Sequence, residues 1–182
     1  MILSDRTIQQ FIDDGKIKIF PEFSLKDIRP SGIRLHLGGE LLIPLEGQKI
    51  DLEGNENPRF DRVSLLQKDF VLHPGQFILG TTYEKFQVPR DIVCFVDGRS
   101  TVARLGLAIH CTSGIIDGNF EEARTIVLEI KNQGPFDLVL RYKTALAMLS
   151  FHQLTTEIAQ SAQKQYQGQD GVIAPNLKLQ KQ

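Results

Sequence analysis

The stretch DIVCFVDGRSTVARLG, residues 91–106, joins an apolar run to a dense polar cluster. Its first part, DIVCFV, has the β-branched and aromatic side chains typical of a buried strand. Similar short runs, separated by Gly, Pro and Asn, follow one another along the chain. They are IRLHLGGELLIPL (33–45), FILGTTYEKFQVP (77–89), TIVLEIKN (125–132), FDLVLRY (136–142) and ALAMLSFHQL (145–154). Many short strands at close spacing predict a mainly β fold, either a sandwich or a barrel.

The polar cluster DGRSTVARLG follows its strand directly. Ser100 or Thr101 is expected to cap a short helix over residues 101–105, which leaves free backbone N–H groups at the helix start. The guanidiniums of Arg99 and Arg104 stand beside those groups in the sequence. A helix start beside arginines suits a phosphate group. The alternative is a solvated turn whose arginines pair with nearby acids.

One short helix is expected before the strands, with few others in the chain. In LSDRTIQQFIDDGKI, Ser4 is a typical helix start and Gly15 a typical helix end. Three apolar residues recur at helical spacing and share one face: Ile8, Phe11 and Ile12. This spacing predicts a short amphipathic helix at the N-terminus.

Length and composition indicate one globular domain over residues 1–182. The formal net charge of −1 argues against broad contact with nucleic acid or a membrane surface. The sequence has no signal-peptide pattern and no apolar run of membrane-spanning length. Cys94 and Cys111 lack metal-type or disulfide-type spacing, so we expect reduced core thiols. Together these features predict a cytoplasmic protein.

The last stretch, residues 156–182, is rich in Gln, Gly and Lys and poor in core residues. Such a C-terminal tail is either without fixed structure or a lid that closes over a ligand. The composition alone leaves both possibilities open.

Two further blocks carry candidate chemistry. In HCTSGIIDGNF, Gly114 indicates a turn or a close backbone approach, and Asp117 precedes a Gly-Asn pair typical of a hairpin turn. In TIVLEIKN, the period of two places Glu129 on the face opposite Leu128 and Ile130. On a cleft wall such a carboxylate can move protons, whereas on an open face it is an ordinary strand residue.

The order of these blocks resembles one family. DGRSTVARLGL, HCTSGIIDGNF, IVLEI and YQGQ, in that order, are similar to the dCTP deaminase family of the dUTPase-like superfamily. The opening MILSDRTIQQFIDDGKI and the middle LHPGQFILGTTYEKFQVP are similar to it as well, so the resemblance covers nearly the whole chain. It implies a distorted, jelly-roll-like β-barrel (dUTPase-like) that assembles as a homotrimer with active sites between subunits.

The resemblance also implies a role for each site residue. Glu129 matches the family's catalytic glutamate, which takes a proton from water as it attacks C4 of the cytosine in dCTP. Ser100 and Arg104 would place and polarise that water. Phosphate oxygens would be held by Arg99, Ser100 and Thr101. The other expected substrate contacts are Thr112, Ser113, Gly114, Phe120, Tyr166 and Gln169. Mg²⁺ would arrive with the triphosphate, no catalytic zinc is expected, and dTTP would be a feedback inhibitor.

The motif Gly114-Ile115-Ile116-Asp117 bears on which reaction is catalysed. Deaminase-only members of the family tend to carry His-Arg before Ile-Asp, whereas bifunctional members and dUTPases carry Gly and an apolar residue there. This chain resembles the second kind, in which Asp117 activates water for cleavage between the α- and β-phosphates. With Glu129 retained, the resemblance implies conversion of dCTP to dUMP. The alternatives are a dUTP diphosphatase alone and a nucleotide-binding trimer without turnover.

The chain departs from the family pattern at several positions. In KQYQGQ, Lys164 is displaced by one residue, and Ile158 stands near an expected tyrosine. Arg34 and His36 replace an acid and an arginine, and Ser113 replaces an alanine. The segment EEART, which precedes the strand of the catalytic glutamate, is longer than usual. Divergence of this kind is also what a relative with dUTPase activity alone would show.

Overall fold

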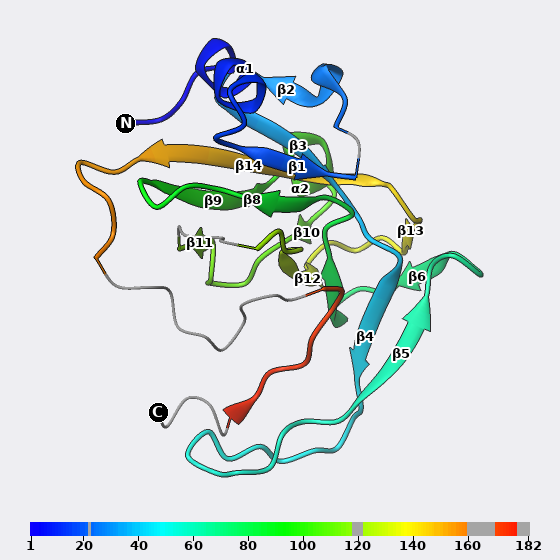
Figure 1. Ribbon diagram of the computed structural model, residues 1–182. Helices are drawn as coiled ribbons and strands as arrows, with labels where there is room; N and C mark the ends of the chain where they lie inside the picture. Colours follow the sequence, from blue (N-terminus) through cyan, green and yellow to red (C-terminus); the bar gives the residue numbers. More distant parts are fainter. Residues whose placement is uncertain (22, 118–121, 160–169, 178–182) are drawn as a thin grey trace.

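The computed structural model describes residues 1–21, 23–117, 122–159 and 170–177. Within these residues the fold is built mainly from two five-stranded antiparallel sheets (Figure 1). The first sheet has the order β10 (Leu107–Ala108), β12 (Val127–Asn132), β7 (Phe77–Thr81), β4 (Glu40–Pro44) and β5 (Phe60–Ser64). The second has the order β11 (Ile115–Ile116), β9 (Ile92–Gly98), β14 (Ala145–Gln153), β3 (Gly32–His36) and β2 (Ile28–Arg29). The predicted mainly β fold is therefore confirmed.

Smaller elements complete the described part of the chain. Two ribbons pair β1 (Lys18–Phe20) with β8 (Lys85–Gln87), and β6 (Phe70–Leu72) with β13 (Leu138–Leu140). The helical elements are α1 (Asp5–Asp13), α2 (Ser100–Ala103) and the 3-10 turn η1 (Leu25–Asp27). No helix in the described ranges is both long and apolar enough to cross a bilayer.

The predicted N-terminal helix is confirmed as α1. The Ser4 hydroxyl accepts a hydrogen bond from the Thr7 N–H at 3.5 Å, as expected of a helix cap. The helix ends before Gly15, whose φ of +69° lies in the left-handed region that glycine adopts without strain. Ile8 is fully buried, and Phe11 and Ile12 pack against the core beside it. The helix thus covers part of the core with its apolar face.

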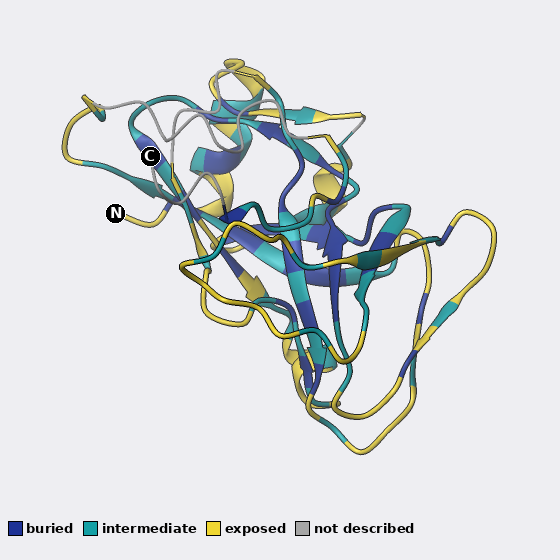
Figure 2. Cartoon of the chain, turned by 90° about the horizontal axis from the view of Figure 1, so that it is seen from below, coloured by how far each residue is buried: buried dark blue, intermediate teal, exposed yellow. Residues whose placement is uncertain are grey.

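The main core is formed by alternate side chains of both large sheets. On β3, Ile33 and Leu35 are fully buried; on β12, Leu128 and Ile130 are buried in the same way. Because side chains alternate along a strand, the residues between them point away from this core. Figure 2 shows the result: buried segments follow the central strands, and the long connections are exposed.

A second, smaller apolar cluster lies on the other face of the first sheet. Residues 170–177, here called the C-terminal strap, lie beside this face (red in Figure 1). Val172, which is 2% exposed, packs there with Leu42 and Leu79. The strap is also held by polar contacts, because the Thr125 hydroxyl donates to the Gly171 carbonyl at 3.3 Å. This part of the predicted tail is packed against the sheet.

Candidate active site

Glu129 stands on β12, on the face that points away from the main core. Its neighbours Leu128 and Ile130 are buried, whereas Glu129 is half-buried, so the predicted alternation is confirmed. Antiparallel pairing sets Glu129 opposite Leu79 of β7. One carboxylate oxygen, Oε2, accepts a hydrogen bond from the backbone N–H of Cys111 at 2.9 Å. The carboxylate thus lies between an apolar strand and a backbone donor.

The loop that carries this donor follows β10 and is braced against β9. The Val96 N–H donates to the Gly114 carbonyl at 2.9 Å, and His110 Nε2 lies 3.6 Å from Asp97 Oδ1. A Cβ atom on Gly114 would lie 3.3 Å from both the Val96 carbonyl oxygen and His110 Cε1. The close backbone approach predicted at Gly114 is therefore present. It holds the loop of Thr112 and Ser113 beside the strand that leads to the polar cluster.

The two cysteines differ from the prediction that both are core thiols. Cys94 is buried, and burial raises the pKa of its thiol. Cys111 is exposed, so the prediction is wrong for this residue. Its backbone N–H and its thiol both contact Glu129 of β12. Partial desolvation and the charge of Glu129 raise the pKa of the Cys111 thiol.

The polar cluster forms the end of β9 and the short helix α2. The helix begins one residue earlier than predicted, with Arg99, not Ser100 or Thr101, at the capping position and without a side-chain cap. The reason is tertiary: the Arg99 guanidinium Nη1 donates to the Ala145 carbonyl at 2.7 Å. The Arg99 N–H also donates to the adjacent Leu146 carbonyl, at 3.3 Å. These bonds tie Arg99 to β14.

The other side chains of the cluster face solvent. Ser100, Thr101 and Arg104 are all exposed, and α2 packs beside β10, which pairs with β12. Among the described residues, no hydrogen bond or ion pair joins Glu129 to Ser100 or Arg104. The chain therefore brings these groups to neighbouring elements without direct contact.

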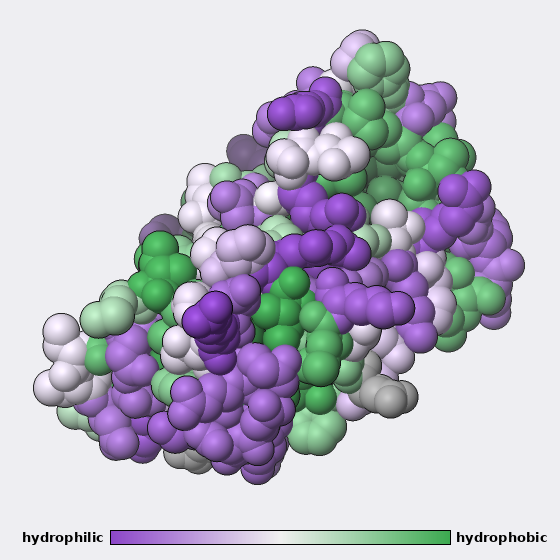
Figure 3. Space-filling view, turned by 90° about the horizontal axis from the view of Figure 1, so that it is seen from above, coloured by the Kyte–Doolittle hydropathy of each residue, from purple (hydrophilic) through white to green (hydrophobic). Residues whose placement is uncertain are grey.

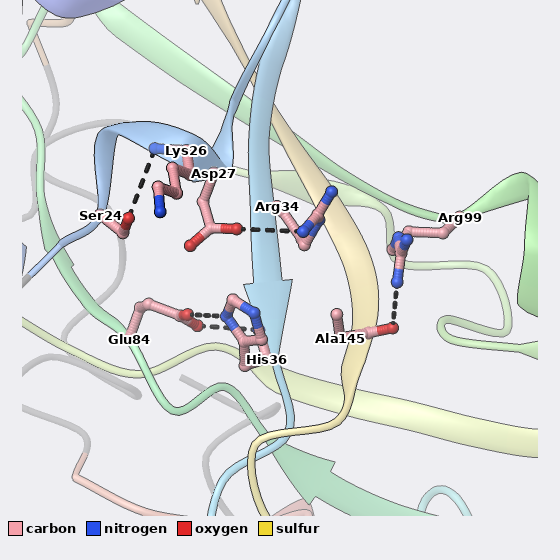
Figure 4. Close-up of polar contacts among 8 residues, drawn as sticks. All are labelled: Ser24, Lys26, Asp27, Arg34, His36, Glu84, Arg99 and Ala145. Carbon is pink, nitrogen blue, oxygen red and sulfur yellow. Dashed lines mark hydrogen bonds and ion pairs between the residues drawn. The ribbon is translucent and has the colours of Figure 1, made fainter.

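Arg34 and His36, which depart from the family pattern, have acidic partners near Arg99 (Figure 4). Glu84, which is 5% exposed, accepts the His36 N–H at 3.0 Å and lies 2.5 Å from the His36 imidazole Nδ1. Arg34 forms an ion pair with Asp27 at 3.3 Å. Both replacements are therefore accommodated by carboxylates from other parts of the chain.

Asp117 follows β11 directly and is exposed. Burial lowers the pKa of the Arg124 guanidinium to about 10, and the negative charge of Asp117 opposes this by raising it. Arg124 is fixed by paired backbone bonds to Phe86, at 2.8 and 3.0 Å. Arg124 lies in the unusually long segment EEART, and no sequence pattern marks it as a neighbour of Asp117.

Three predicted substrate contacts, Phe120, Tyr166 and Gln169, lie outside the described residues. The described ranges contain no group of three or more His, Cys, Asp or Glu side chains arranged as metal ligands. The expectations about Mg²⁺ and zinc stay predictions.

The arrangement of strands is found in an enzyme of known structure. The 2'-deoxycytidine 5'-triphosphate deaminase from Agrobacterium tumefaciens superimposes with a TM-score of 0.63 at 22% sequence identity. The match spans 82% of this chain and 47% of that one. At this identity the likeness establishes the class of fold, a β fold used by a nucleotide deaminase.

Sequence comparison goes further. Residues 2–154 match the family described as dCTP deaminase-like. The dUMP-forming dCTP deaminase of Dictyoglomus turgidum is 34% identical over 98% of this chain and 96% of its own length. That of Methanosphaera stadtmanae is 35% identical over 97% and 94%. The dCTP deaminase of Aeromonas hydrophila is 34% identical over 97% and 98%. The chain belongs to the dCTP deaminase-like family.

Proposed function

We propose that the protein deaminates dCTP to dUTP and then cleaves dUTP to dUMP and diphosphate. Family membership and the dUMP-forming relatives support this reading. The observation that carries it is the placement of Glu129, whose carboxylate is held beside the loop of Thr112 and Ser113. The motif that ends in Asp117 supports the second step.

In the deamination step, Glu129 acts as the base. It accepts a proton from water as the water oxygen bonds to C4 of cytosine. One of the two water protons ends on ring nitrogen N3, and the other on the amino group, so that the C4–N bond breaks and ammonia leaves. Thr112 and Ser113 read the base. Ser100 and Arg104 place and polarise the water.

The phosphates are assigned to the start of α2. Arg99, Ser100 and Thr101 supply a guanidinium, hydroxyls and backbone N–H groups, which suit phosphate oxygens. Mg²⁺ enters as part of the nucleotide substrate. Asp117 activates the water that cleaves the linkage between the α- and β-phosphates. Phe120, Tyr166 and Gln169 complete the contacts to the nucleotide. The same site would take dTTP as an inhibitor.

We also propose a homotrimer with sites between subunits. Ile115 and Phe95 are strand partners, and they are 58% and 37% exposed. Apolar residues also reach the surface in several patches on the face shown in Figure 3. Exposed apolar pairs of this kind are what a subunit interface covers. The separation of Ser100 and Arg104 from Glu129 within one chain supports a site to which two copies contribute.

The remaining expectations follow from the same reading. Residues 1–182 form one domain, in which segment 156–182 closes over the bound nucleotide. We place the protein in the cytoplasm, where the free thiols of Cys94 and Cys111 stay reduced.

The test is a product assay with purified protein, Mg²⁺ and either dCTP or dUTP. We expect dUMP from both substrates. Accumulation of dUTP from dCTP would leave only the deaminase, and turnover of dUTP alone would leave only the diphosphatase. Turnover of neither would indicate a nucleotide-binding protein without catalysis.

Two variants assign the steps. Glu129→Gln is expected to abolish deamination and keep nucleotide binding, and Asp117→Asn to abolish diphosphate release while dUTP still accumulates from dCTP. The matched control is Glu46→Gln, because Glu46 is an exposed carboxylate that lies far from Asp117 and Glu129 in the sequence. Deamination by Glu129→Gln would show that the base is wrongly assigned.

A further inference from the structure

We propose that the backbone N–H of Cys111 is a positioning group for the catalytic base. By binding Oε2 of Glu129, it fixes the carboxylate so that Oε1 is left to accept the proton of the attacking water. The proposal rests on the proposed role of Glu129, and it concerns a group of this chain to which no role has been given above.

The geometry that supports it is a contact between two neighbouring strands. β10 and β12 run antiparallel, with Ala108 opposite Lys131, so the chain after β10 runs alongside Glu129. There the Cys111 nitrogen lies 2.9 Å from Glu129 Oε2, a normal length for a hydrogen bond to a carboxylate. The Cys111 thiol also points back to β12, 3.7 Å from the Glu129 carbonyl oxygen.

On the side of β7, the described residues give Glu129 an apolar neighbour. Its partner on β7 is Leu79, which is 7% exposed and packs under Val172 of the C-terminal strap. The carboxylate therefore has an apolar wall on one side and a backbone donor on the other. A donor in a partly dry environment holds a carboxylate more strongly than one in water.

The donor itself is held in place before substrate arrives. The loop is tied to β9 through the bond from Val96 to Gly114, and Gly114 lies against the His110 ring. A donor fixed by its own surroundings needs no rearrangement during the reaction, which is the property of preorganised catalytic sites.

Within the described residues, the charges that act on the Cys111 thiol are those of Glu129 and of Lys131 on the same strand. The loop also carries His110, whose ring lies near Asp97, whereas β7 and the strap present the apolar Leu79 and Val172. The pKa of the Cys111 thiol is raised, so the thiol stays neutral near neutral pH and adds no charge beside the base. The N–H group does not titrate.

The test compares two variants that both lack the Cys111 thiol and that differ only in the backbone N–H at this position. Incorporation of lactic acid, the α-hydroxy acid analogue of alanine, at position 111 replaces the amide by an ester, and Cys111→Ala, which keeps the N–H, is the matched control. Relative to that control, kcat for dCTP deamination is expected to fall by about ten- to a hundredfold, with KM little changed. A thermal unfolding midpoint equal to that of Cys111→Ala reports that the ester variant is folded.

Equal kcat values for the ester variant and Cys111→Ala would overturn the proposal. A second measurement needs no variant at position 111: in the unsubstituted protein, the Cys111 amide proton resonance should shift with pH along the acid limb of kcat. A resonance that stays constant there would overturn the proposal as well. The Glu129→Gln variant distinguishes this outcome from a wrong assignment of the base. If Glu129 is not the base, Glu129→Gln still deaminates dCTP, whatever the variants at Cys111 show.

Discussion

Replacing Val172 by alanine tests whether packing docks the C-terminal strap beside the active site. The Val172 side chain is 2% exposed and packs against Leu42 and Leu79. The substitution removes two buried methyl groups at about 0.8 kcal/mol each, so docking should weaken by roughly 1.6 kcal/mol, before any remaining cavity adds to the loss.

The assay is hydrogen exchange of the Leu177 N–H, which donates to Asn57 Oδ1 at 2.8 Å at the far end of the strap. If the strap opens as a unit, a loss of about 1.6 kcal/mol speeds this exchange by roughly 15-fold. Ile173→Ala is the matched control, because Ile173 is the next residue and is 41% exposed. Its exchange rate should stay within about twofold of the unsubstituted protein.

The reasoning is refuted if Val172→Ala and Ile173→Ala accelerate the exchange equally. It is also refuted if neither variant changes the rate, since a segment docked through Val172 cannot lose two buried methyl groups without opening more often.

Three further perturbations have definite expected outcomes. Glu84→Ala removes both acceptors of His36 and should lower the free energy of unfolding by about 2–3 kcal/mol in urea titrations, whereas the exposed Glu46→Ala should not. Burial and the N-terminal ammonium lower the pKa of His152 in the folded protein below its ordinary value of 6.5. The neutral His152 side chain therefore contributes its full stabilisation above pH 6.5, and this stabilisation is lost as the pH falls through the pKa of the folded state. Between about pH 7 and pH 5, the free energy of unfolding should therefore fall less for His152→Gln than for the unsubstituted protein. Arg104→Ala should lower kcat for dCTP deamination by about tenfold or more in steady-state kinetics, because Arg104 is proposed to polarise the attacking water, and unchanged kinetics would assign Arg104 to a solvated turn.

Features that depend on local pattern could be predicted from the sequence. The period of two in TIVLEIKN placed Glu129 opposite Leu128 and Ile130, and the structure confirms it. Ser4 and Gly15 marked the ends of the first helix, because capping and left-handed backbone depend on the residue itself. The blocks from DGRSTVARLGL to YQGQ carried the family resemblance, which the family comparison confirms.

Contacts that depend on strand pairing could not be predicted in this way. The N–H of Cys111 has no side-chain signature, so only the pairing of β10 with β12 reveals that it binds Glu129. The capping position of Arg99 was mispredicted because a carbonyl of β14 binds its guanidinium. The packing of Val172 on the sheet has the same origin. Periodicity and capping act over a few residues of one segment, whereas these contacts exist only once distant segments have been brought together by the tertiary fold.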